Sequence, residues 1–100
     1  MSEKSPTSSV KSYKAAHILL PAKHEAEDIL RKLRGGADFS DLAKKFSSCA
    51  SAVNGGDLGL IKIGKAHEDF EAATLKLKVG ETTVTPVRTS FGYHIIKRLG

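Results

Sequence analysis

Two short segments, one near each end of the chain, carry apolar residues on both of their alternating faces. Residues 13–20 read YKAAHILL, and residues 93–99 read YHIIKRL. Successive side chains of a strand point to opposite faces of its sheet, so a strand that is apolar on both faces is covered on both sides. We therefore expect both segments to be central strands of one small sheet with packed layers on its two faces.

Each segment contains one histidine among apolar neighbours. Alternation places His17 with Ala15 and Leu19 on one face of the first strand, and His94 with Ile96 on one face of the last. If the two strands are neighbours, both histidines lie on the same face of the sheet. They then either form the floor of a site or are ordinary hydrogen-bonded residues of the core.

Three amphipathic helices are predicted between these strands, from apolar residues spaced three and four positions apart. The first is ended by Gly35-Gly36, the second is capped by Asp38, and the third begins near His67 and is terminated by Gly80. Their predicted inward faces carry, in chain order, Ala26, Ile29, Leu30 and Leu33; Phe39, Leu42, Ala43 and Phe46; and Phe70, Ala73 and Leu77.

The remaining segments complete an α+β arrangement. Residues 47–57, SSCASAVNGGD, lack any period and are predicted to form a loop, and residues 58–62 are predicted to form a short strand. Residues 82–87 predict a further strand, in which Pro86 indicates a sheet edge or a strand end. The predicted order is β-α-α-β-α-β-β, which is compatible with parallel or antiparallel pairing.

Length and composition limit the domain organisation. One hundred residues, 40% of them hydrophobic and 27% charged, suffice for a single core. Residues 1–12, MSEKSPTSSVKS, are polar and are predicted to be a flexible leader before one domain at residues 13–100. No apolar run in the sequence approaches the roughly 18 residues that a membrane span needs, so no membrane partner is expected.

Cysteine content and charge indicate the compartment and the class of partner. The single cysteine, Cys49, and the lack of an apolar segment resembling a signal peptide favour a reducing, cytoplasmic location. Sixteen Lys and Arg against 11 Asp and Glu give a net charge of +5, which permits weak polyanion binding. The basic residues are spread along the chain with acids between many of them, so a solvated basic surface is favoured over a nucleic-acid site.

Two chemistries that use cysteine and histidine are disfavoured by the spacing. A nucleophilic Cys49 would need a histidine and an orienting acid, but the sequence indicates no such acid and contains no GxSxG pattern. A zinc site would gather Cys49 with His17, His67 and His94, but no pair has CxxC or HxxxH spacing.

Five further segments form an ordered set along residues 13–99. They are AAHILL around His17, GGADFSDLAKKFS at 35–47, the Cys49 loop leading into GGDLG at 55–59, GKxxxxFEAA at 64–73, and SFGYHIIK at 90–97. In this order and spacing they resemble the motifs of the parvulin family of peptidyl-prolyl cis/trans isomerases. The resemblance implies a parvulin-like (FKBP-like) fold: a four-stranded antiparallel sheet surrounded by helices, with a proline-binding cleft on its concave side.

The resemblance also implies roles for nine residues. His17 and His94 match the family's paired sheet histidines and Cys49 its loop cysteine, which together form a polar hydrogen-bonded cluster beneath the substrate. The implied reaction is rotation about X-Pro bonds in proline-containing polypeptides or unfolded proteins, by a monomer, without a covalent step, cofactor or metal. The implied proline pocket is formed by Leu58, Ala66, His67, Phe70, Thr89 and Phe91.

Two departures from the family pattern affect the predicted activity. Many members have a Met where this chain has Ala66, and its loss removes about 1 to 3 kcal/mol of apolar contact, which weakens activity without abolishing it. We expect His67 to fill part of the gap.

Phospho-directed members carry an Arg/Lys-rich loop after the first strand, whereas this chain has only Pro21-Ala22-Lys23-His24. The sequence therefore predicts a phosphate-independent isomerase. The alternative is a non-catalytic chaperone or peptide-binding module with the same cleft.

Overall fold

A computed structural model describes residues 11–100. The predicted leader lies almost wholly outside the described residues, and Ser12, its last residue, is already part of the first strand. The elements in chain order are β1 (Ser12–Leu20), α2 (Lys23–Arg34), α3 (Phe39–Phe46), the 3₁₀ helix η1 (Ala50–Asn54), β2 (Asp57–Lys62), α4 (Glu68–Lys76), β3 (Val87–Thr89) and β4 (Gly92–Arg98).

The four strands form one antiparallel sheet in the order β2-β1-β4-β3. The two segments that are apolar on both faces, β1 and β4, occupy its centre, as their pattern predicted. Their register pairs His17 with Ile96 and Leu19 with His94. The histidines are thus diagonal neighbours on one face of the sheet, also as predicted.

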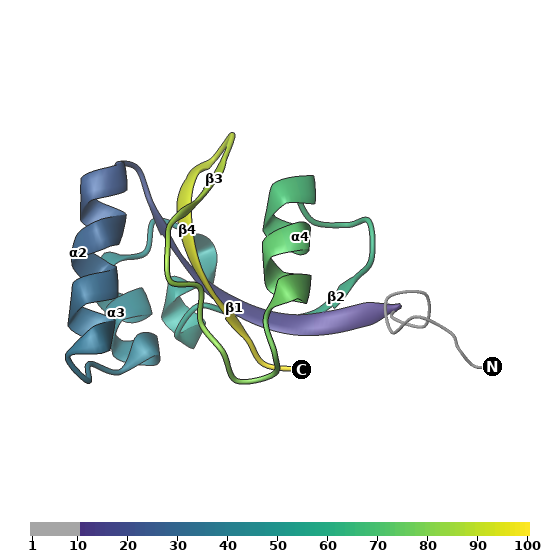
Figure 1. The fold of residues 1–100 in the computed structure, drawn as a ribbon, viewed down its shortest axis with the longest axis horizontal. Helices are drawn as coiled ribbons and strands as arrows, with labels where there is room; N and C mark the ends of the chain where they lie inside the picture. The colour runs from purple at the N-terminus through teal and green to yellow at the C-terminus, as the bar shows by residue number, and fades with distance from the viewer. Residues whose placement is uncertain (1–10) are drawn as a thin grey trace.

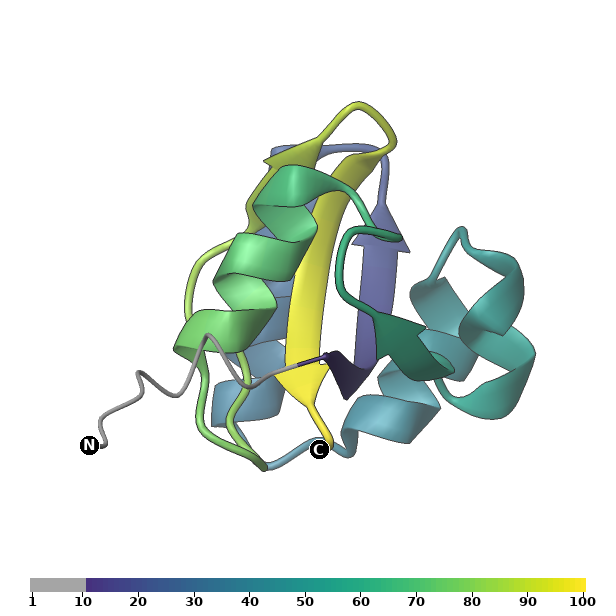
Figure 2. The same cartoon turned by 90° about the vertical axis from the view of Figure 1, so that its right-hand side faces the viewer.

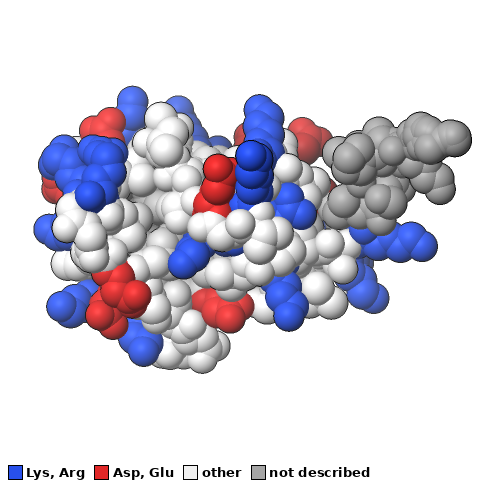
Figure 3. Space-filling model, turned by 60° about the horizontal axis from the view of Figure 1, so that its bottom comes forward, with Lys and Arg blue, Asp and Glu red and all other residues white. Residues whose placement is uncertain are grey.

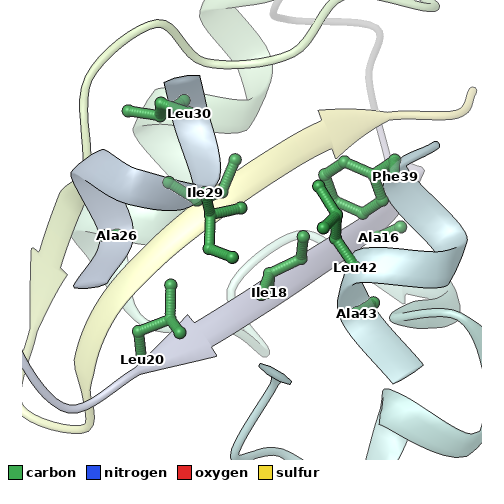
Figure 4. Packing of buried hydrophobic residues seen from close by; sticks show 10 residues of the cluster. Ala16, Ile18, Leu20, Ala26, Ile29, Leu30, Phe39, Leu42 and Ala43 are labelled. Carbon is green, nitrogen blue, oxygen red and sulfur yellow. The ribbon is translucent and has the colours of Figure 1, made fainter. Parts of the chain in front are cut away.

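Helices cover both faces of this sheet (Figure 1). On one face, β1 residues such as Ile18 and Leu20 pack against Ile29 of α2 and Leu42 of α3 (Figure 4). Helix α4 lies over the other face (Figure 2), where its Phe70 packs with Ala15 of β1 and Ile96 of β4. Both central strands are therefore buried from two sides, which explains why neither shows polar alternation.

The helix boundaries follow from capping groups. The side chain of Asp38 accepts a hydrogen bond from the Asp41 N–H and caps α3, as predicted. The ring of His67 accepts a hydrogen bond from the Asp69 N–H and caps α4. Helix α4 ends at Lys76, four residues before the predicted terminator Gly80, so Leu77 caps it and the helical residues that α4 buries are Phe70 and Thr74.

Two sequence predictions for the connections were wrong. The strand predicted at residues 82–87 is displaced: Thr82 makes only an isolated bridge to Lys97, and β3 begins at Val87 and runs to Thr89. Residues 80–83 do make backbone hydrogen bonds to β4, among them one from the Thr83 N–H to the Ile96 carbonyl. The Ile96 N–H, however, bonds the Thr83 hydroxyl rather than its carbonyl, and Pro86 has no N–H to donate, so the pairing does not continue as a regular ladder. The predicted loop at 47–57 contains η1.

Within residues 11–100, no helix has the length and apolar character that crossing a membrane requires.

Candidate active site

A pocket of about 250 Å³ opens on the α4 face of the sheet, lined by residues of α4, β2 and the two central strands. Eight of the nine residues predicted from the sequence line it, which brings together side chains from four parts of the chain. These eight are His17, Cys49, Leu58, Ala66, His67, Phe70, Phe91 and His94. The ninth, Thr89, lies directly behind the pocket, bonded to His94.

The floor of the pocket is the histidine pair. The rings of His17 and His94 stack with centroids 5.0 Å apart and an interplanar angle of 24°, and their Nδ1 atoms are 2.9 Å apart. At this distance one Nδ1 carries a hydrogen and donates a hydrogen bond to the other Nδ1. The Nε2 of His94 lies 2.6 Å from the hydroxyl oxygen of Thr89, which also accepts a hydrogen bond from the Phe91 N–H.

The hydrogen bonds among Thr89, His94 and His17 can run in either direction, and one direction leaves fewer polar groups unpaired. If the Thr89 hydroxyl donates to His94 Nε2 and His94 Nδ1–H donates to His17 Nδ1, the only buried ring atom without a partner is His17 Nε2. In the reverse direction the Thr89 hydroxyl hydrogen is unpaired as well. Because unpaired buried polar groups are costly, the first order is favoured, and it places the unpaired N–H on His17.

Both imidazoles are neutral at neutral pH. Burial lowers the pKa of His17 from 6.5 to about 4. The pKa of His94 is lowered to about 4 by burial and, in addition, by repulsion from His17 and His67 in their protonated forms. The edge of the Phe70 ring contacts both, with centroids 5.6 Å from His17 and 5.4 Å from His94. These ring contacts contribute to the burial of the pair.

Cys49 reaches the same pocket but stands apart from the histidine network. It is half-buried and precedes η1, in a segment held to β1 by a hydrogen bond from the Ser48 N–H to the Leu19 carbonyl. Among residues 11–100, no hydrogen bond joins the Cys49 thiol to either histidine. The implied hydrogen-bonded cluster of three residues is therefore a pair of histidines with Thr89, because Cys49 is attached to the edge of β1 rather than to the sheet face.

The lip of the pocket is formed by Ala66 and His67, in the turn between β2 and α4. The carboxylate of Glu71 holds this turn: it accepts hydrogen bonds from the buried Tyr13 hydroxyl and from the Gly64 N–H, each at 3.1 Å. His67 is exposed and its ring caps α4, so only part of it borders the hollow that a larger residue at Ala66 would fill.

Sequence reasoning missed two lining residues, Leu19 and Ile61. Alternation already placed Leu19 on the same face as His17, and Ile61 lies in the predicted strand at 58–62, so both could have been found from strand faces. His17, Cys49, His67 and His94 share the pocket. Nevertheless, no group of three or more His, Cys, Asp and Glu side chains in the described part of the chain is arranged to hold a metal ion.

Comparison with known proteins identifies the family. The model of the rotamase family, described as the PPIC-type PPIase domain, matches residues 8–99. This chain belongs to that family. It is therefore a peptidyl-prolyl isomerase domain, and the parvulin resemblance and the four-stranded α+β fold are confirmed.

Relatives differ in how much of their length the domain covers. The chain is 49% identical over 86 residues to the foldase protein PrsA of Bacillus subtilis, spanning 85% of this chain and 29% of that protein. NmPin, the parvulin of Nitrosopumilus maritimus, has a solved structure with TM-score 0.79 and 42% identity, covering 91% of this chain and 98% of that one. A Campylobacter jejuni structure described among SurA-like chaperones has TM-score 0.83 and 38% identity, covering 89% and 38%. The chain thus spans less than a third of PrsA.

Proposed function

We propose that the pocket binds the prolyl ring of a polypeptide and accelerates cis/trans rotation of the preceding X-Pro bond, with no requirement for a phosphate. The observation that carries this proposal is an apolar pocket standing on a neutral, hydrogen-bonded histidine pair. At about 250 Å³ the pocket is smaller than usual drug-sized sites and suits a single side chain.

The reaction needs a site that prefers a twisted amide. Rotation about the peptide bond has a barrier of roughly 18 to 20 kcal/mol, because the amide must give up its resonance. The twisted state has less charge separation than the planar amide, so walls made by Leu58, Phe70 and Phe91, which displace water, favour it. The neutral His17 and His94 supply a fixed polar floor without placing a charge beneath the substrate.

Phosphate independence is supported by the charge of the lining. None of the ten residues around the pocket is Lys or Arg. The connection from β1 to α2 is only Pro21-Ala22, after which Lys23 begins the helix. A dianionic phosphate beside the proline would therefore lack the cationic cluster that such groups require.

The test is exchange NMR and a coupled isomerisation assay on short Xaa-Pro peptides. We expect Phe91→Ala to lower kcat/KM about tenfold and Phe70→Ala about a hundredfold, from lost apolar contact of roughly 1.4 and 2.8 kcal/mol. Phe91 is 72% exposed, so its variant folds even if Phe70→Ala does not. The control is Val84→Ala, which is 79% exposed and lies away from the pocket. Parent-like rates in both Phe variants would remove the pocket from the mechanism.

The residue before proline is tested with a peptide series containing Ala, Leu, Glu or phosphoserine at that position. We expect rates for phosphoserine no higher than for Glu. A marked phosphoserine preference would overturn the assignment of substrate.

A second candidate is a module that holds proline-containing or unfolded segments without catalysis. It is favoured by Ala66, which leaves the lip of the pocket short of apolar contact, and by the relative described as a SurA-like chaperone. Exchange NMR separates the two candidates: a binder shifts peptide signals without accelerating exchange between their cis and trans forms.

We also propose that the domain acts as a monomer in the cytoplasm, with only weak affinity for polyanions. The single cysteine supports a reducing compartment. The exposed large apolar residues lie singly on separate elements, among them Phe46 on α3, Leu60 on β2 and Val84 before β3, which supports the monomeric state. Light scattering during size-exclusion chromatography measures the latter directly, and a dimer mass would contradict it.

A further inference from the structure

The loop between α3 and β2, residues 47–56, is attached to β1 at both of its ends. At one end the Ser48 N–H donates to the Leu19 carbonyl at 2.8 Å, and at the other the His17 N–H donates to the Gly56 carbonyl at 2.9 Å. His17 and Leu19 both line the pocket, and so does Cys49, which lies between the two attachments. The position of this loop therefore sets how far the Cys49 wall of the pocket stands from the sheet.

The first attachment also uses a side chain, that of Ser47. Its hydroxyl oxygen accepts hydrogen bonds from the Leu19 N–H at 3.0 Å and from the Cys49 N–H at 3.3 Å. The Ser47 N–H donates to the Ala43 carbonyl and closes the last turn of α3. One half-buried residue thus joins the end of a helix, the edge of β1 and the loop, although it does not line the pocket itself.

The Leu19 N–H depends on this hydroxyl because β2 does not extend so far along β1. The register between the two strands ends where Ala16 faces Asp57, and Leu19 lies beyond that point. Alternation directs the backbone groups of Leu19 away from β4 and toward the loop, where the Ser47 hydroxyl and the Ser48 N–H meet them. A partly buried N–H that loses its acceptor costs about 1 to 3 kcal/mol, so without the hydroxyl the loop should move rather than stay in place.

We propose that Ser47 is a positioning residue of the isomerase site, whose hydroxyl holds Cys49 against Leu19 and thereby fixes one wall of the pocket. The residue acts through these two neighbours and does not touch the substrate. This inference rests on the proposed function, because the wall affects a rate only if a prolyl ring occupies the pocket.

The floor of the pocket is held by other contacts. The backbone of His17 is bonded to Gly56, and the ring of His94 to Thr89, so neither depends on Ser47. Loss of the hydroxyl should therefore widen the pocket and leave the histidine pair in place. A looser wall weakens binding of the planar and the twisted amide alike, and such a loss raises KM while kcat stays nearly unchanged.

The test compares Ser47→Ala, which removes the acceptor, with Ser47→Thr, which keeps it. The backbone at this position is extended, with φ −70° and ψ 135°, a conformation that suits threonine. We expect Ser47→Ala to raise KM for an Ala-Pro peptide about tenfold, the effect of one lost hydrogen bond, and Ser47→Thr to recover most of the affinity. The matched control is Ser48→Ala, at an exposed neighbour that bonds Leu19 through its backbone N–H, which the substitution keeps.

Two further measurements report on the loop without reference to catalysis. Amide hydrogen exchange at Leu19 and Cys49 should be faster in Ser47→Ala than in the parent, because both N–H groups lose their acceptor. The Cys49 thiol should also react several times faster with iodoacetamide, since thiol reactivity rises with exposure. Thermal unfolding verifies that each variant is folded.

The outcomes separate this inference from the function on which it rests. A parent-like KM in folded Ser47→Ala would overturn the positioning role and leave the isomerase proposal intact, whether or not the thiol reacts faster. An equal rise of KM in Ser48→Ala, or a folded Ser47→Thr that behaves like Ser47→Ala, would also overturn it, because the effect would not belong to the hydroxyl. No acceleration of any peptide by the parent protein would reject the proposed function and, with it, this inference.

Discussion

His17 and His94 are 5% and 4% exposed, and burial is the main reason that their pKa values are depressed. In a neutral imidazole one nitrogen donates a hydrogen bond and the other accepts one. Thr89, His94 and His17 can therefore form a continuous line of hydrogen bonds. Protonation would place two donors face to face at Nδ1 and break that line. The neutral state therefore maintains the geometry of the floor.

This depression predicts acid sensitivity. Each histidine has a pKa near 6.5 when unfolded and about 4 when folded, so between these values the unfolded chain binds more protons and stability falls as pH falls. The contribution of each histidine to the free energy of unfolding is fully present above about pH 6.5 and is lost by about pH 4. It is on the order of 3 kcal/mol for each group. We expect the imidazole carbon signals of His17 and His94 to stay in the neutral form down to about pH 5, and isomerase activity to stay constant over that range. Titration of either ring near pH 6.5 would contradict the prediction.

The small side chain of Ala66 at the pocket lip predicts a gain of activity. Ala66→Met adds apolar surface at the lip of the proposed proline pocket, worth about 1 to 2 kcal/mol, so kcat/KM should rise about tenfold in the peptide assay. Ala72→Met, on the exposed side of α4, the helix that follows the lip, is the matched control and should leave the rate unchanged. An unchanged rate in Ala66→Met would show that substrate does not touch this lip.

At the scale of elements, the turn between β2 and α4 is held by one carboxylate. Glu71 receives the Tyr13 hydroxyl from the sheet and the Gly64 N–H from the turn, and so joins three elements at the pocket lip. Burial, together with the hydrogen bond to Glu71 and the charge of its carboxylate, raises the pKa of the Tyr13 hydroxyl, which therefore remains a donor throughout the working range.

Loss of this carboxylate should loosen the lip. Glu71→Ala removes the acceptor for both donors, and we expect faster amide hydrogen exchange at residues 63–67 with a roughly tenfold rise in KM and little change in kcat. Glu71→Gln, which keeps one acceptor oxygen, should recover most of the affinity. Glu68→Ala, at an exposed acid in the first turn of the same helix, is the control. Parent-like exchange in Glu71→Ala would show that the turn is held by other contacts.

Hydrophobic periodicity predicted the elements that bury a regular apolar face. It failed to predict the strand boundary where a side chain, rather than a backbone carbonyl, accepts the hydrogen bond. The two-sided apolar strands gave β1, β4 and the shared face of His17 and His94. No pattern could show that the Ile96 N–H would bond the hydroxyl of Thr83 rather than its carbonyl, so that pairing with β4 stops after residues 82–83 and resumes only at Val87. Likewise, Cys49 lies outside the histidine network because the neighbouring Ser48 N–H bonds the Leu19 carbonyl of β1. That contact joins residues far apart in sequence, so no local pattern indicates it.

At the scale of the whole molecule, charges of both signs are mixed on the face that Figure 3 shows. Figure 3 shows Lys and Arg side chains around the face in view, with Asp and Glu among them. We expect a surface of this kind to attract polyanions weakly, through its net charge of +5.

Polyanion binding should therefore be weak and easily screened. We expect DNA or heparin binding with a shallow dependence on salt, lost at about 150 mM, and little changed when residues 1–12 are removed. Fluorescence anisotropy across a salt series measures this. Tight binding with a steep salt slope that disappears with residues 1–12 would instead indicate a dedicated basic arm.

The central pairing of β1 with β4 also has a consequence for how the domain forms. Ala15 is paired with Arg98, so the middle of the sheet closes only when segments from nearly opposite ends of the chain meet. Helices α2 and α3 can form within microseconds from local contacts, whereas such distant pairing must first overcome the entropy of closing a long loop. Until then one edge of β1 lacks its partner and part of its apolar surface is uncovered. The sheet is thus slow to close, and the chain is vulnerable to aggregation until its last strand pairs with β1.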